Sequence, residues 1–279
     1  MLRQRVLTAV VLVAVVLWLL FAASQQIWQW AFLGVAVLSA WEWAAFAKRD
    51  RLLERIAFMI VVFAVSDSLV QAWNTDWRND YFTATIPLLT SIPLLLAIVV
   101  WVSRYQKNKG QAVLTHPGVI LLLGVWMIAL FTYAMVLLRA SLSPSEILLS
   151  MLAVWAIDTG AYFTGRRFGK TKLAVHVSPG KTWEGVIGGG LLAFAVLLLG
   201  SLIGIQQGTL SIGLFTVIGT LIALLSVYGD LFQSVLKRQV GLKDSGHILP
   251  GHGGILDRID SLLIAMPLFA LLWLGSMLK

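Results

Sequence analysis

The chain has 279 residues, of which 59% are hydrophobic and 12% are charged, and its mean hydropathy is +0.87. Soluble domains of this length are less apolar, and the scarcity of charge together with the absence of cysteine excludes disordered chains and disulfide-rich secreted scaffolds. We therefore expect an integral membrane protein, which leaves channels, transporters and membrane enzymes open.

Nine segments are apolar and long enough to cross a bilayer, which needs about 20 such residues per helix. We predict an all-α polytopic protein with membrane helices at residues 6–23, 28–47, 56–73, 86–102, 118–138, 146–163, 184–204, 212–236 and 259–278. The first segment also resembles a signal peptide, because Arg3 and Arg5 precede an apolar run that ends in small residues. The length of that run favours a helix that is retained.

Lysine and arginine are distributed very unevenly between alternate loops. If the N-terminus is cytoplasmic, all but three of the 21 basic residues lie on the cytoplasmic side, and the exceptions are Arg78, Arg139 and Lys279. Basic residues accumulate in short cytoplasmic loops, so this orientation is the expected one, with the C-terminus outside. Two dense polar loops, 164–183 and 237–258, then lie at the cytoplasmic face.

Seven carboxylates lie in or beside apolar segments, where each costs about 2.5–3.5 kcal/mol at a helix centre. They are Glu42, Asp67, Asp158, Glu184, Asp230, Asp257 and Asp260. All except Asp67 are expected near the cytoplasmic ends of their helices. An ion or proton conductor would distribute such groups through the bilayer, so this arrangement favours a site that faces cytosolic solutes.

The two polar loops combine carboxylates, basic residues and glycines, which is the chemistry of a metal and polyphosphate site. The i, i+3 spacing of Asp257 and Asp260 places them on one helix face, and Asp230 and Lys237 share a face of the preceding helix. Together with Asp158, these stripes from three helices can form a cation site inside a helix bundle.

The same residues also have simpler structural interpretations. Asp257 and Asp260 could cap the start of a helix, and Asp158 and Asp230 could each pair with a buried basic residue. His252 lies in the glycine-rich turn PGHGG, where a role in the turn alone is sufficient.

Two glycine-containing segments are not interpreted as phosphate sites. The segment GRRFGKT at 165–171 has three residues between its glycines, whereas a P-loop needs four, and no strand is expected before it. The glycines at 188–190 are expected to be close contacts between helices.

The second polar segment resembles a known enzyme family. Residues 234–261, SVLKRQVGLKDSGHILPGHGGILDRIDS, are similar to the long and specific signature of the phosphatidate cytidylyltransferases. The stretches WAIDTGAYFTGRRFGK and SPGKTWEG resemble the same family, so the similarity covers about residues 155–261. It implies that CTP and phosphatidate react to give CDP-diacylglycerol and diphosphate, as in phospholipid biosynthesis, with Mg²⁺ required.

The resemblance also implies site residues. Asp230, Asp257 and Asp260 would be metal-binding and catalytic carboxylates, with Lys237 beside them, and Asp158 is a further candidate metal ligand. The candidates for binding the substrates are Ser178, Lys181, Arg238, Lys243, His252, Gly253, Gly254 and Arg258.

The expected partners are CTP, phosphatidate and the lipid bilayer, and not nucleic acid. K⁺ as a second cation and a homodimer are compatible with the resemblance. We expect an inner-membrane protein with its active site facing the cytoplasm, in which residues 1–140 form a variable lipid-embedded region and residues 141–279 the catalytic region.

Two alternatives stay open at this point. Another CTP-dependent lipid enzyme, such as a polyprenol kinase, would share the metal and phosphate chemistry. An ion-coupled transporter would place polar residues at the bilayer midplane of several helices, where only Asp67 is expected. The DGxxAR-type motif of the CDP-alcohol phosphatidyltransferases is not found in the sequence.

Overall fold

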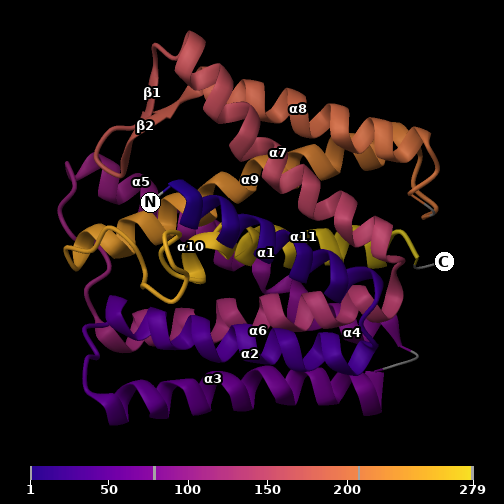
Figure 1. The fold of residues 1–279 in the computed structure, drawn as a ribbon, viewed down its shortest axis with the longest axis horizontal. Coiled ribbons are helices and arrows are strands. Elements are labelled where there is room, and N and C mark those ends of the chain that lie inside the picture. Colours follow the sequence, from indigo (N-terminus) through magenta and orange to yellow (C-terminus); the bar gives the residue numbers. More distant parts are fainter. Residues whose placement is uncertain (1, 78–79, 207, 278–279) are drawn as a thin grey trace.

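The computed structural model describes residues 2–77, 80–206 and 208–277, and its helices run side by side in alternating directions between two ends of the molecule (Figure 1). The first half contains α1 (Leu2–Phe21), α2 (Gln25–Phe46), α3 (Leu52–Ala72) with the short π-helix η1 (Trp73–Trp77), α4 (Tyr81–Leu89), α5 (Ser91–Lys107) and α6 (Pro117–Ser141). The second half contains α7 (Pro144–Phe168), strands β1 (Lys172–Ala174) and β2 (Ser178–Thr182), α8 (Trp183–Leu202), α9 (Ile212–Gln239), α10 (Leu256–Ile259) and α11 (Leu262–Gly275).

This arrangement confirms the predicted all-α polytopic fold. Each of the nine predicted segments overlaps one helical pass, with α4 and α5 forming one pass and α10 and α11 another. Among the described residues, seven passes are long and apolar enough to cross a membrane. The other two are α1, whose apolar part is Val6–Phe21, and α2, which carries three glutamines and Glu42 along its 22 residues.

Helix α11 lies inside the bundle, packed against α6 and α9. Its sequence is apolar on every side, as expected for a helix surrounded by others. The buried Trp273 on α11 packs against Phe215 of α9 and donates its indole N–H to Ser150 Oγ of α7 at 2.8 Å. These contacts fix α11 relative to α7 and α9, the two helices that carry Asp158 and Asp230.

Glycines allow α7 and α8 to approach until their backbones touch. A Cβ on Gly189 would lie 2.5 Å from the Ile157 carbonyl oxygen, and a Cβ on Gly160 would lie 2.8 Å from the Gly188 carbonyl oxygen. The expectation of close helix contacts at 188–190 is therefore confirmed. The β1–β2 hairpin closes the end of this helix pair, with Lys172 opposite Thr182.

The segment that resembles a P-loop in sequence is not a loop in its first half. Residues 165–168 form the last turn of α7, and Gly169 caps it through an N–H that donates to the Gly165 carbonyl at 3.0 Å. The rejection of a P-loop is thus consistent with the fold. The β1–β2 hairpin that follows is an addition to the sequence prediction, which described residues 164–183 only as a polar loop.

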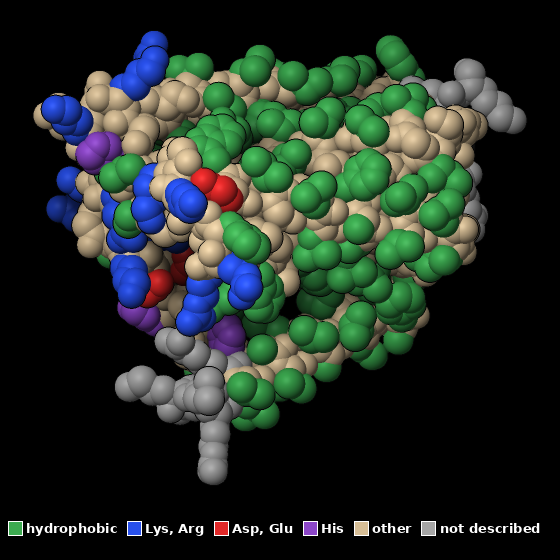
Figure 2. Space-filling view, turned by 90° about the horizontal axis from the view of Figure 1, so that it is seen from above, with side chains coloured by type: hydrophobic (Ala, Val, Ile, Leu, Met, Phe, Trp, Pro, Cys, Tyr) green, Lys and Arg blue, Asp and Glu red, His purple; other side chains and the backbone are tan. Residues whose placement is uncertain are grey.

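Charged side chains gather at one end of the molecule, and hydrophobic side chains are spread over the remaining visible surface (Figure 2). That end carries the β1–β2 hairpin and the 240–255 segment. At the other end, Arg139 donates from Nη2 to the Ala23 carbonyl at 3.2 Å. Arg78 and Lys279, which were also expected there, lie outside the described residues, as do the side chains of Arg3 and Arg5.

Candidate active site

Four carboxylates from three passes come together near the charged end. Asp158 lies on α7, Asp230 on α9, Asp257 on α10, and Asp260 at the junction of α10 and α11. Asp260 is within electrostatic range of Asp230 and Asp158. We refer to these four residues as the carboxylate cluster.

Gly229 permits this convergence. A Cβ at that position would lie 2.5 Å from the Asp260 carbonyl oxygen, so α9 touches the backbone at the start of α11. Asp230 is the next residue along α9. The glycine therefore brings Asp230 and Asp260 together from segments that are 30 positions apart in the sequence.

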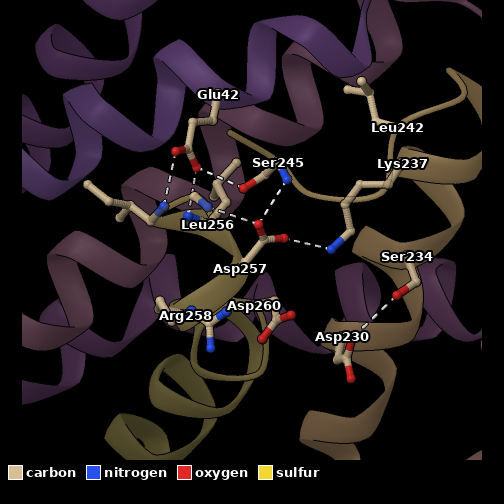
Figure 3. Close-up of polar contacts among 12 residues, drawn as sticks. Glu42, Asp230, Ser234, Lys237, Leu242, Ser245, Leu256, Asp257, Arg258 and Asp260 are labelled. Carbon is tan, nitrogen blue, oxygen red and sulfur yellow. Dashed lines mark hydrogen bonds and ion pairs between the residues drawn. The ribbon is translucent and has the colours of Figure 1, made fainter. Parts of the chain in front are cut away.

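Asp257 is held in place by an ion pair and two backbone groups. Its Oδ1 is 2.7 Å from Lys237 Nζ, and its Oδ2 accepts hydrogen bonds from the N–H groups of Ser245 and Gly254 at 2.9 and 3.1 Å (Figure 3). The side chains of Lys237 and Asp257 are 10% and 8% exposed. Buried charges of opposite sign compensate each other's desolvation, so this pair fixes the end of α9 to α10.

Glu42 on α2 is the least expected member of the site. It is 2% exposed, and its carboxylate accepts hydrogen bonds from Ser245 Oγ at 2.9 Å and from the N–H groups of Ile255 and Leu256 at 3.0 and 2.9 Å. Those N–H groups belong to the start of α10, which lacks a side-chain cap of its own. Figure 3 shows Glu42 on the opposite side of this turn from Asp260.

Two glycines make room for the Glu42 carboxylate. A Cβ on either Gly246 or Gly254 would collide with its oxygens. The GHGG turn is therefore glycine-rich partly because a carboxylate from a distant helix occupies the space beside it. Gly253 adds a second reason, since its φ of +83° lies in the left-handed region.

Lys181 joins the cluster from the hairpin. Its ammonium group on β2 forms an ion pair with Asp230, whose Oδ1 also accepts a hydrogen bond from Ser234 Oγ at 3.4 Å. Asp158 lies within electrostatic range of both Lys181 and Asp230. Asp230 and Lys237 therefore share a face of α9, as their spacing predicts, and Ser234 lies between them on the same face (Figure 3).

Carboxylate oxygens are the ligands that a hard divalent cation prefers, and the cluster supplies four carboxylates from three helical passes. Among the described residues, no three His, Asp or Glu side chains are gathered closely enough to hold one ion. In this arrangement Lys237 and Lys181 neutralise Asp257 and Asp230. Asp158 and Asp260 complete the set that Mg²⁺ chemistry would use.

The other predicted substrate-binding residues lie around the cluster rather than in it. Arg258 is exposed and donates to the His252 carbonyl from Nε at 3.1 Å and Nη2 at 2.6 Å, which holds the GHGG turn. Arg238 donates to the Leu242 carbonyl at 3.2 Å, and Lys243 is exposed. Ser178 begins strand β2 opposite Ala174, at the far end of the hairpin from Lys181.

The other carboxylates singled out in the sequence have separate roles. Glu184 accepts from the Thr171 N–H at 3.0 and 3.2 Å and so closes the base of the hairpin. Asp67 accepts from Gln71 Nε2 at 3.3 Å, one turn along α3. Neither belongs to the cluster.

A cavity of about 700 Å³ with charged residues in its lining lies between the end of α2 and the 242–248 segment. Trp41, Lys48, Arg55 and Asp244 line it together with Glu42, so its charges are mixed. None of the substrate-binding or metal-binding candidates from the sequence lines this cavity. We therefore do not place a substrate there.

Comparison with known proteins identifies the family. A sequence model described as the cytidylyltransferase family matches residues 3–274. The chain belongs to this family. It is 37% identical to a phosphatidate cytidylyltransferase of Pseudomonas aeruginosa over 98% of this chain and 97% of that protein. It is also 37% identical to one of Haemophilus influenzae (97% and 98%) and 35% identical to one of Helicobacter pylori (97% and 92%).

Membership of the cytidylyltransferase family makes the chain a nucleotidyltransferase, which confirms the resemblance seen in residues 155–261. The match also extends through the N-terminal passes, including α2 and Glu42. An ion-coupled transporter is therefore the wrong class. Cytidylyltransferase activity implies CTP as a substrate. The membrane helices indicate that the reaction takes place in a membrane.

Proposed function

We propose that this cytidylyltransferase converts CTP and phosphatidate into CDP-diacylglycerol and diphosphate. The observation that carries the proposal is 37% identity to a phosphatidate cytidylyltransferase along 98% of the chain, a region that includes every residue of the carboxylate cluster. A polyprenol kinase would transfer phosphate instead of CMP, whereas the relatives named above are phosphatidate cytidylyltransferases.

The reaction needs little proton chemistry. A phosphate monoester carries close to two negative charges at neutral pH, since its second pKa is about 6, so its oxygen is already a nucleophile. That oxygen forms a bond to the α-phosphorus of CTP, and the bond from the α-phosphorus to diphosphate breaks. The barrier comes mainly from bringing two polyanions together, and the site must supply positive charge in a fixed place.

Two lysines supply positive charge, and two carboxylates hold the backbone around the site. Lys237 and Lys181 place ammonium groups beside the cluster, each already oriented by its carboxylate partner. Glu42 and Asp257 hold the 245–256 segment by its backbone N–H groups, so the approach to the cluster keeps its shape. Preorganised groups of this kind lower the barrier because they do not reorient during the reaction.

Asp158, Asp230, Asp257 and Asp260 are the residues we propose as ligands for Mg²⁺. When bound, Mg²⁺ would supply positive charge that offsets repulsion between the two substrates and stabilises the departing diphosphate. K⁺ as a second cation and a homodimer stay predictions, as do the binding roles of Ser178, Arg238, Lys243, His252, Gly253 and Gly254.

We further propose that the charged end faces the cytoplasm and that the protein resides in the inner membrane. CTP is a cytosolic solute, whereas phosphatidate keeps its tails in the bilayer. The cluster lies near the end of the helix bundle that carries most of the basic side chains, and basic residues favour the cytoplasmic side (Figure 2). Both substrates can then meet there.

The test is a transfer assay with radiolabelled CTP, phosphatidate and purified protein in liposomes, with and without Mg²⁺. We expect Mg²⁺-dependent formation of labelled CDP-diacylglycerol, and its loss in Asp257→Asn and Asp260→Asn. The matched control is Asp67→Asn, an intramembrane carboxylate outside the cluster, which should keep wild-type turnover. Absence of product from wild-type protein would contradict the function, and normal turnover of both cluster variants would contradict the ligand assignment.

A further inference from the structure

An apolar groove of about 390 Å³ opens on the side of the helix bundle, within the usual range for a ligand pocket. Its walls come from α1, α2, α6 and α7 and from the segment that contains α10. The lining side chains are almost entirely aliphatic or aromatic, and Arg258 is the one charged residue among the described residues that line it.

The groove leads along α7 toward the carboxylate cluster. Leu148, Met151 and Trp155 line it, and their spacing of three and four residues makes them one stripe of the helix. The same stripe continues three residues further, to Asp158. The cytoplasmic continuation of this wall therefore borders the cluster.

The wall opposite α7 contains Arg258, the charged residue of the groove. Ile255, Ile259 and Leu262 line the groove at helical spacing, and Arg258 lies among them at the charged end. Asp257 and Asp260 lie on the other face of the same turn (Figure 3). One helical turn therefore presents Arg258 to the apolar groove on one face and the proposed metal ligands Asp257 and Asp260 on the other.

We propose that this groove binds the acyl chains of phosphatidate, with Arg258 donating to the lipid phosphate from Nη1, while Nε and Nη2 keep their bonds to the His252 carbonyl. The inference rests on the proposed function and deepens it by assigning the lipid subsite. Aliphatic walls match hydrocarbon chains, and an arginine at the end nearest the cluster matches a phosphate monoester, for which guanidinium is a preferred partner. The phosphate would then lie at the level where the reaction occurs.

Helix α1 is the wall past which the lipid enters. It packs mainly against α2 and α7, and Val13, Val15 and Leu17 line the groove while being 56%, 46% and 40% exposed. Its Thr8 hydroxyl donates to the Pro250 carbonyl at 3.0 Å, which ties α1 to the turn held by Arg258. The exposure of the three α1 side chains leaves the groove open to lipid along this helix.

The first experiment measures binding without catalysis. Phosphatidate that carries a diazirine near the end of one acyl chain is photolysed with the full-length protein in liposomes without CTP, and labelled peptides are mapped by mass spectrometry. We expect labels in residues 12–19, 31–35 and 148–155, competed by unlabelled phosphatidate and reduced about tenfold in Arg258→Gln. Labels confined to α3 or α5, or labels that do not compete, would overturn the assignment.

The second experiment separates the groove from the reaction. Val16→Trp and Ala31→Trp fill the groove, so the ratio of kcat/KM for dioleoyl- over dihexanoyl-phosphatidate should fall about tenfold. The control is Ala14→Trp, an exposed position on α1 outside the groove, which should leave the ratio unchanged. An unchanged ratio in both groove variants would overturn the inference. Failure of wild-type protein to use either lipid would contradict the proposed function, whereas crosslinking would still report on the groove.

Discussion

The ion pair between Lys237 and Asp257 is almost completely enclosed, with side-chain exposures of 10% and 8%. Removing one member of such a pair leaves a buried charge without compensation, which typically costs about 3–5 kcal/mol, whereas removing both costs much less. Because Asp257 is also a proposed metal ligand, we expect stability and activity to depend on the same two side chains at the residue scale.

We expect Lys237→Met to lower the free energy of unfolding by about 3 kcal/mol. The double variant Lys237→Met/Asp257→Leu should recover part of that loss while remaining inactive. Thermal unfolding in detergent and the transfer assay measure the two effects separately. The single variant Asp257→Leu completes the comparison. If the free energy of unfolding lost in the double variant equals the sum of the losses in the two single variants, the two charges do not stabilise each other.

Glu42→Gln tests the carboxylate that caps α10. Glutamine keeps the shape but directs an NH₂ group at donors, so at least one hydrogen bond from Ile255 N, Leu256 N or Ser245 Oγ is lost. Hydrogen bonds to a charged group contribute about 1.5–3 kcal/mol, and we expect a loss of that size together with a lower kcat. Asp67→Asn is the matched control, because it removes an intramembrane charge that pairs within its own helix. Equal effects of the two substitutions would contradict a specific role for Glu42.

The sequence predicted the chemistry of these residues better than their partners. Asp230, Asp257 and Asp260 were singled out by charge in apolar surroundings. The structure places Asp230 within electrostatic range of Asp260, and Asp257 lies on α10, three residues before Asp260. Glu42 was singled out by the same signal, but its partner Ser245 is 203 positions away, and no local pattern encodes that distance. The i, i+3 spacing of Asp257 and Asp260 predicted a shared helix face. It did not predict that Asp257 accepts hydrogen bonds from backbone N–H groups of the preceding loop.

At the scale of elements, the close contact between α7 and α8 sets the position of the hairpin and of Lys181. Helices in a membrane gain little from hydrophobic burial against each other, so close packing at small residues contributes much of their association. The Gly160, Gly188 and Gly189 contacts supply that packing.

Gly189→Val should separate the two helices, because the new Cβ would lie 2.5 Å from the Ile157 carbonyl oxygen. Overpacking of this kind costs about 1–3 kcal/mol, and activity should fall as Lys181 moves away from Asp230. Gly34→Val on α2 is the control, since a Cβ at that position would have nothing within 4 Å. Thermal unfolding and the transfer assay would reveal no difference between the two variants if the glycine contact were unimportant.

The helices could be predicted because length and apolarity are properties of a continuous segment. The hairpin at 172–182 could not, since β1 has three residues and both strands are mixed in polarity. Its position depends on Glu184, which accepts from the Thr171 N–H across 13 positions. Short elements stabilised by such individual contacts carry little periodic signal.

At the scale of the whole molecule, the absence of cysteine makes orientation directly measurable. Lys170→Cys places a thiol in the exposed segment at the charged end, and Gln26→Cys places one at the start of α2, at the opposite end. A membrane-impermeant maleimide applied to intact spheroplasts should label Gln26→Cys, and Lys170→Cys only after permeabilisation. The reverse pattern would place the charged end outside and contradict access of cytosolic CTP.

The proposed division into residues 1–140 and 141–279 stays a prediction, and two features cross it. Helix α6 packs against α11, and Glu42 bonds to residues 245–256. The first half therefore does more than anchor the second in lipid. It supplies a side chain to the shell of the site and a wall to the apolar groove.

The capping of α10 by Glu42 has a consequence for how the protein is made. Translation delivers α2 long before the 245–256 segment exists, and the bond from Leu256 to Glu42 closes a loop of 214 positions. Contacts of such large sequence separation form late, because the intervening chain must first be placed. Asp257 and Asp260 lie at the start of the last pass, so the carboxylate cluster is complete only when that pass is in place. We therefore expect an incompletely synthesised chain to be inactive.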